Sequence, residues 1–210
     1  MRISMAICGV LAMVLTATSV ANAGIMYADE VTTINRGDTS IGNYAGFYGG
    51  TYPGSFPVEL TEEQAKAAIL GPPDTSFLSL PGGVPVTGAA FSYAYVQVEF
   101  PQPFYATGVS LYITELGANQ ESAQLWLWAS GGGNIQPDIQ RNGDDTIVVD
   151  LSPYADFMNA HGGAFVAVSI GGRDLRGDSQ GFDLDAVGVT TLIPAPGAIL
   201  LGALGAGAVG

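Results

Sequence analysis

The sequence predicts an all-β fold, an antiparallel β-sandwich with the topology of a jelly roll. After residue 75, apolar residues recur at every second position in a series of short segments, as in half-buried strands. Thirty glycines and 12 prolines supply the turns between such segments. Only one early segment carries both a helix start and a helix stop. Many short strands with Gly-rich turns are typical of two antiparallel sheets packed face to face.

The N-terminal residues 1–23 precede this fold and indicate a secretory signal peptide. They contain one basic residue, a central apolar stretch and a small-residue cleavage pattern. These features are Arg2, residues 5–15, and Ala21 and Ala23 before Gly24. The apolar stretch is too short for a membrane span, which needs roughly 20 residues. We therefore expect cleavage by signal peptidase and export, with residues 24–192 as the folded domain.

The first part of that domain is expected to hold one strand, one loop and one helix. Residues 27–34 form a strand pattern, and the Gly- and Tyr-rich segment 42–54 predicts a surface loop. Residues 61–70 predict a helix, because Thr61 and Gln64 have the spacing of a capping box. Gly71 and the two prolines after it end the helix.

The rest of the domain alternates between strands and turns. Strands are expected over residues 77–80, 89–100, 109–113, 125–128, 146–151, 165–170 and 182–186. The alternation changes phase between Tyr95 and Val96, which predicts a bulge or bend there. Asn142-Gly143 predicts a hairpin turn.

Charge and cysteine content exclude several functional classes. The chain has 19 acidic against 6 basic residues, a formal charge of −13, so it would repel the phosphates of nucleic acids. The single cysteine, Cys8, lies in the signal peptide, which leaves the mature domain without disulfides or thiol chemistry. His161 is the single histidine. Glu99, Glu115 and Glu121 could supply the two carboxylates that a glycosidase needs, but among 19 acidic residues such a pair is expected by chance. We do not expect an enzyme.

A calcium site is one hypothesis for the acidic residues near the C-terminal end of the domain. Carboxylates on a Gly-rich loop suit a hard cation such as Ca²⁺. The set is Asp174, Asp178, Asp183 and Asp185. The alternative is a solvated acidic loop whose charge is partly neutralised by Arg173 and Arg176.

Two tryptophans are the second candidate site. Trp126 and Trp128 share one face of their strand. If this face is open, the indoles could stack on sugar rings. The alternative is that both faces of the strand are covered and the indoles belong to the core.

The C-terminal residues 193–210 have a pattern of their own. Pro194, Ala195, Pro196 and Gly197 precede a run of apolar, mostly small residues. This segment resembles the PEP-CTERM sorting signal of Gram-negative bacteria, with Ala195 in place of the motif's Glu. No Arg-rich cluster follows, so the signal is either truncated or degenerate. The resemblance implies processing by an exosortase-type enzyme and transient anchoring in the inner membrane.

Two internal segments strengthen this resemblance. Residues 67–74 and 181–187 are similar to segments of PEP-CTERM cell-surface proteins, whose domains resemble the galactose-binding-like sandwich. The resemblance implies a cell-surface or extracellular-matrix protein with a structural or adhesive role. The alternative function is a carbohydrate-binding module for extracellular polysaccharide, with or without calcium.

Overall fold

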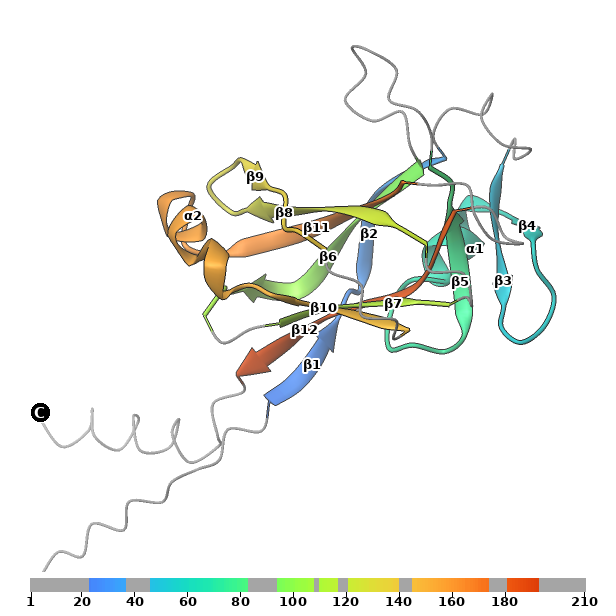
Figure 1. Cartoon of the computed structure of the whole chain (residues 1–210), viewed down its shortest axis with the longest axis horizontal. Coiled ribbons are helices and arrows are strands. Elements are labelled where there is room, and N and C mark those ends of the chain that lie inside the picture. Colours follow the sequence, from blue (N-terminus) through green and yellow to red (C-terminus); the bar gives the residue numbers. More distant parts are fainter. Residues whose placement is uncertain are drawn as a thin grey trace, which may run out of the picture. The chain divides into compact units, whose positions relative to one another are not determined.

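Two antiparallel β-sheets pack face to face in the computed structural model of this chain (Figure 1). The structure describes residues 23–36, 46–82, 94–107, 110–116, 121–139, 145–173 and 181–192. These residues belong to one compact unit, Ala23–Leu192. The predicted all-β sandwich is confirmed.

Each sheet combines strands that are distant in the sequence. In the described residues one sheet contains β1 (Ala23–Tyr27), β3 (Phe47–Thr51), β4 (Val58–Leu60), β5 (Ser76–Leu80), β7 (Ser110–Glu115), β10 (Thr146–Asp150) and β12 (Phe182–Leu192). Their order is β10-β7-β12-β5-β3-β4, and β1 pairs with β12. The other sheet has the order β2-β6-β11-β8-β9 and contains β2 (Glu30–Arg36), β6 (Ala94–Phe104), β8 (Ala123–Ala129), β9 (Asn134–Ile135) and β11 (Phe165–Gly172). From β5 onward the chain passes repeatedly between the sheets.

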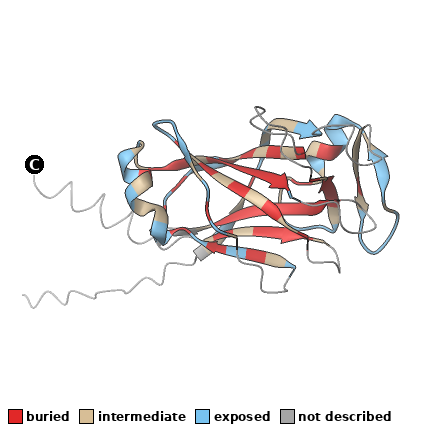
Figure 2. Cartoon of the chain, turned by 45° about the horizontal axis from the view of Figure 1, so that its top comes forward, coloured by how far each residue is buried: buried red, intermediate tan, exposed pale blue. Residues whose placement is uncertain are grey.

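The core lies between the two sheets, where the alternating apolar residues meet. In β8, Leu125 and Leu127 are fully buried while Trp126 between them is partly exposed. The opposite sheet contributes Leu111, Ile113 and Phe182, which are also fully buried. Figure 2 shows this buried layer along both sets of strands. Each such side chain stabilises the fold by about 1.5–3 kcal/mol relative to its exposed state.

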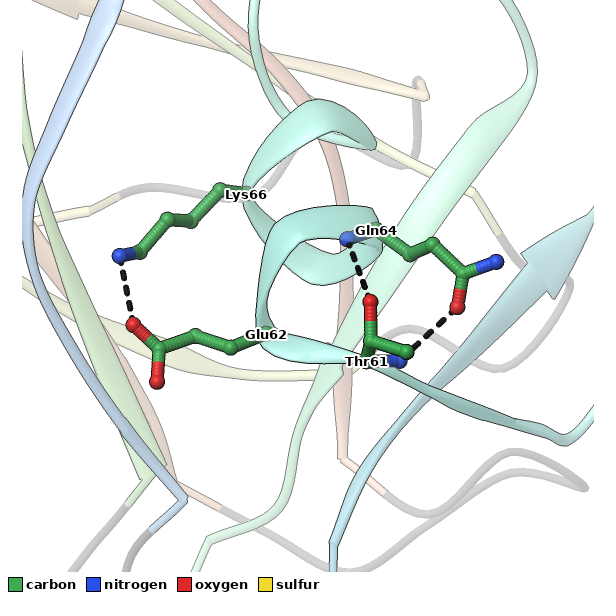
Figure 3. Close-up of polar contacts among 4 residues, drawn as sticks. All are labelled: Thr61, Glu62, Gln64 and Lys66. Carbon is green, nitrogen blue, oxygen red and sulfur yellow. Dashed lines mark hydrogen bonds and ion pairs between the residues drawn. The ribbon is translucent and has the colours of Figure 1, made fainter.

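Helix α1 (Glu62–Ala67) begins where the capping box predicted it but ends three residues before the predicted end at residue 70. The Thr61 Oγ1 accepts a hydrogen bond from the Gln64 N–H at 3.2 Å, and the Gln64 Oε1 accepts one from the Thr61 N–H at 2.9 Å (Figure 3). The Lys66 ammonium lies 2.6 Å from the Glu62 carboxylate one turn earlier. The cap satisfies backbone donors that a helix start otherwise leaves unpaired.

The loop prediction for residues 42–54 is wrong in its second half, where β3 pairs with β5. Glycine is needed in this strand because the sheet packs closely: a Cβ on Gly49 would lie 2.0 Å from the Phe77 carbonyl oxygen. Glycine-rich sequence therefore marks a close backbone approach here. Residues 42–45 of the predicted loop lie outside the described residues.

The predicted bulge between Tyr95 and Val96 is also wrong. These residues continue the β6 pairing without interruption, opposite Gly171 and Ile170 of β11. Before the phase change, the aromatic residues occupy the odd positions Phe91, Tyr93 and Tyr95, and the first two of these lie outside the described residues. The predicted turn Asn142-Gly143 also lies outside them. The register shifts instead at Val31/Thr33, Phe165/Ala167 and Leu184/Ala186.

A second helical segment was not predicted from the sequence. It consists of a 3₁₀ turn, Ser152–Tyr154, followed by α2 (Ala155–Ala160). His161 follows α2, where its Nδ1 lies 2.8 Å from the Phe157 carbonyl oxygen and its ring stacks on Phe157 at 4.2 Å. These contacts give His161 a structural role. In the part of the chain that is described, every helix is too short or too polar to cross a membrane.

Candidate functional site

The outer face of the five-stranded sheet, opposite the core, carries an ordered array of side chains. Strand registers align them in three rows across β2, β6, β11 and β8. Figure 1 shows the strands themselves. The first row is Glu30, Glu99, Ala167 and Trp128. The second is Thr33, Gln97, Ser169 and Trp126, and the third is Asn35, Tyr95, Gly171 and Gln124. We call this set the outer array.

Strand β11, which lies between β6 and β8, contributes only small residues to the outer array, and all of them are buried. Ala167 and Ser169 are each 1 % exposed, and Gly171 is buried as well. A Cβ on Gly171 would lie 3.4 Å from Trp126 Cζ3 and 3.5 Å from Tyr95 Cβ. The Trp126 ring therefore extends from β8 over β11 toward Tyr95. Small residues in β11 let side chains from both neighbouring strands cover it.

A chain of hydrogen bonds fixes the second indole. The Trp128 Nε1–H donates to the Ser169 hydroxyl at 2.7 Å, and this hydroxyl donates to the Gln97 Oε1 at 3.2 Å. The Gln97 amide then donates to the Thr32 hydroxyl at 3.2 Å. The chain connects all four strands of the array. Because the polar edge of Trp128 is satisfied within the sheet, the ring has a defined orientation.

The structure places Trp126 and Trp128 together, on the side of β8 opposite Leu125 and Leu127. Both indoles are partly exposed, whereas the two leucines are fully buried. The alternative that the tryptophans lie in the core between the sheets does not fit this position. Their contact with sugar remains a prediction. Sequence reasoning found this pair, because alternation along a strand shows which residues share a face.

A cleft of about 370 Å³ lies at the edge of the array, next to the start of β8. In the described residues, β9 pairs with β8 only at Leu127 and Trp128. Residues 136–139 line the cleft beside the part of β8 that precedes this pairing. Its polar lining includes Gln124, Gln136, Asp138 and Arg173. We call it the edge cleft. Sequence reasoning missed it, because its lining comes from three separate segments.

One interaction positions the cationic side of the edge cleft. With its amide oxygen facing the guanidinium, Gln124 accepts hydrogen bonds from Arg173 Nη2 at 2.9 Å and Nε at 3.2 Å. The Arg173 backbone N–H also donates to the Ser122 carbonyl at 2.8 Å. Both contacts hold Arg173 against the start of β8.

Two residues of the predicted calcium set make structural hydrogen bonds. The Asp183 Oδ1 accepts from the Ser79 hydroxyl at 2.7 Å, across the β12–β5 pair. Asp185 is 3 % exposed and accepts from the backbone N–H groups of Asp74 and Thr75 at 3.2 and 3.3 Å. Burial raises the pKa of the Asp185 carboxyl, and the two N–H donors oppose this effect. Asp185 thereby holds Thr75, whose φ is +75°.

The other two residues of that set, Asp174 and Asp178, lie outside the described residues. Within the described ranges, no group of three or more His, Cys, Asp and Glu side chains is arranged to hold a metal ion. The four-residue calcium site therefore stays a prediction.

The three glutamates considered for glycoside hydrolysis lie in different environments. Glu99 belongs to the outer array, whereas Glu115 is in β7 of the opposite sheet and is 2 % exposed. Glu121 is also 2 % exposed and precedes β8. The structure thus places Glu99 and Glu115 on separate sheets.

The predicted processing residues fall at the two ends of the described unit. Ala23 and Gly24 begin β1 and pair with Leu192 and Thr191 at the end of β12. Ala21 and the sorting motif at Pro194, Ala195, Pro196 and Gly197 lie outside the described residues. The first and last strands of the domain are therefore neighbours.

No protein-family model and no curated protein matches this sequence.

Proposed function

We propose that this protein binds a neutral polysaccharide through the outer array of its five-stranded sheet. One observation carries the proposal: Trp126 and Trp128 lie together on a sheet face that points away from the core, above small residues of β11. The function is that of a binding module. It extends the structural or adhesive role expected from the sequence by giving the protein a polysaccharide to adhere to.

The chemistry of the array fits a sugar ligand. Indole rings present flat apolar surfaces that match the C–H faces of sugar rings. Next to them Gln97, Glu99 and Tyr95 supply hydrogen-bonding groups for hydroxyls, and all three are partly exposed. The formal charge of −13 disfavours a polyanion at moderate salt. A neutral polysaccharide meets these conditions.

Export and surface display are the second part of the proposal. The signal peptide over residues 1–23 and the PEP-CTERM-like segment over residues 193–210 would bring the domain to the cell surface, where such polysaccharides occur. The pairing of β1 with β12 supports this arrangement, because removal of either segment leaves Gly24–Tyr27 and β12 intact. Signal peptidase and an exosortase-type enzyme are the processing partners that it requires.

Affinity electrophoresis tests the binding function. Residues 24–192 migrate through native gels that contain cellulose derivatives, xylan, mannan, laminarin or, as a polyanion, alginate. We expect at least one neutral polysaccharide to retard the wild type and not Trp126→Ala or Trp128→Ala. Tyr105→Ala is the matched control, because Tyr105 is an aromatic residue, 60 % exposed, outside the array. Equal retardation of all four proteins, or retardation of none, would contradict the proposal.

The same gels test the predicted calcium site. If Asp174, Asp178, Asp183 and Asp185 hold Ca²⁺ that binding requires, EDTA abolishes retardation and added Ca²⁺ restores it. Retardation that persists in EDTA shows that the array binds polysaccharide without calcium.

A further inference from the structure

The edge cleft continues the line of the two indoles. Along the outer side of β8 the residues follow as Trp128, Trp126 and Gln124, and Gln124 lines the cleft. Successive residues on one side of a strand are about 6.7 Å apart. The cleft therefore begins one such step beyond Trp126, in the direction of the strand. A linear ligand stacked on both indoles and extended along β8 would reach it.

The lining of the cleft complements sugar hydroxyls, which both donate and accept hydrogen bonds. Arg173 offers guanidinium N–H donors, and its contact with Gln124 restricts where they point. Asp138 offers acceptors, and Gln136 offers both kinds of group; the two side chains are exposed on the 136–139 segment. The lining thus combines donors and acceptors around a volume of about 370 Å³.

We infer that the edge cleft is a second subsite, which holds the sugar unit that follows those stacked on Trp126 and Trp128. This inference rests on the proposed function and specifies its ligand as a linear neutral chain that runs along β8. The charges of Arg173 and Asp138 offset each other within the cleft. At the other end of the array, Glu30 and Glu99 lie directly opposite each other and would repel an anionic chain.

Chain-length dependence tests the second subsite. Isothermal titration calorimetry would measure affinities of residues 24–192 for cello-, xylo-, manno- and laminari-oligosaccharides of two to six units. We expect the wild-type affinity to rise as the chain lengthens beyond the indoles. In Arg173→Ala and Asp138→Ala this rise shrinks by about tenfold, the effect of one lost hydrogen bond to a charged group, while the shortest chains bind as before.

Controls separate this inference from the proposed function. Lys66→Ala removes one positive charge, as Arg173→Ala does, but on α1 outside the cleft, and should match the wild type at every length. If Arg173→Ala and Asp138→Ala also match the wild type while Trp128→Ala loses binding, the second subsite is wrong and the indole site stands. If no chain of any of the four series binds the wild type, both proposals are overturned.

Discussion

Two neighbouring glycines at the end of β11 should respond in opposite ways to the same substitution. A Cβ on Gly171 would meet its nearest atoms at 3.4–3.5 Å, which is ordinary contact, whereas a Cβ on Gly172 would lie 1.7 Å from the Leu80 carbonyl oxygen. Gly171→Ala should raise the free energy of unfolding by about 0.4–1 kcal/mol, because alanine lowers the conformational entropy of the unfolded chain. Gly172→Ala should lower it by about 1–3 kcal/mol or more, because backbone must move.

Gly171→Val extends this reasoning to the indole. A Cβ at this position already lies 3.4 Å from Trp126 Cζ3, so we expect the two further methyl groups to displace the ring from its position over β11. We expect a loss of stability of about 1–3 kcal/mol, a shift in tryptophan emission, and weaker polysaccharide binding. Urea unfolding followed by circular dichroism measures the stability. Unchanged emission and binding in Gly171→Val would refute the placement of Trp126.

Three other substitutions test separate contacts. Ser169→Ala removes the hydroxyl shared by Trp128 and Gln97, so the free energy of unfolding should fall by about 1–3 kcal/mol; an unchanged urea midpoint would refute the hydrogen-bond chain. Thr61→Ala should cost about 1 kcal/mol through the lost cap, and no loss would show that α1 needs none. Asp185→Asn tests the raised pKa of the Asp185 carboxyl. Because the folded protein binds this proton more tightly than the unfolded chain does, the carboxyl contributes stability at pH values below 3.8 and loses this contribution as the pH rises through the raised pKa. The stability of the wild type relative to Asp185→Asn should therefore decrease as the pH rises over this range. An increase would contradict the raised pKa of Asp185.

Local sequence patterns predicted the elements that depend on local physics. The capping box at Thr61 and Gln64 is complete within one turn, and the helix formed there. The alternation in β8 separated Leu125 and Leu127 from the two tryptophans, because side chains on a strand alternate between faces.

Features that depend on distant segments were not predictable in this way. The glycine-rich segment around Gly49 suggested a loop, because the sequence does not show how closely β5 approaches the backbone of β3. The outer array and the edge cleft depend on registers between strands that lie far apart in the chain. The phase change near Tyr95 was assigned to a bulge or bend, although β6 pairs regularly with β11 from Tyr95 to Glu99.

The two tryptophans provide the most direct test of the proposed binding face. They are the protein's only tryptophans, so a ¹⁵N-labelled sample of residues 24–192 gives two indole N–H signals, both from the outer array. Titration with the neutral polysaccharide that retards the protein in gels should shift both signals and alter the tryptophan emission with the same dissociation constant. Binding that leaves both indole signals unmoved would contradict the account, because the polysaccharide would then occupy another surface.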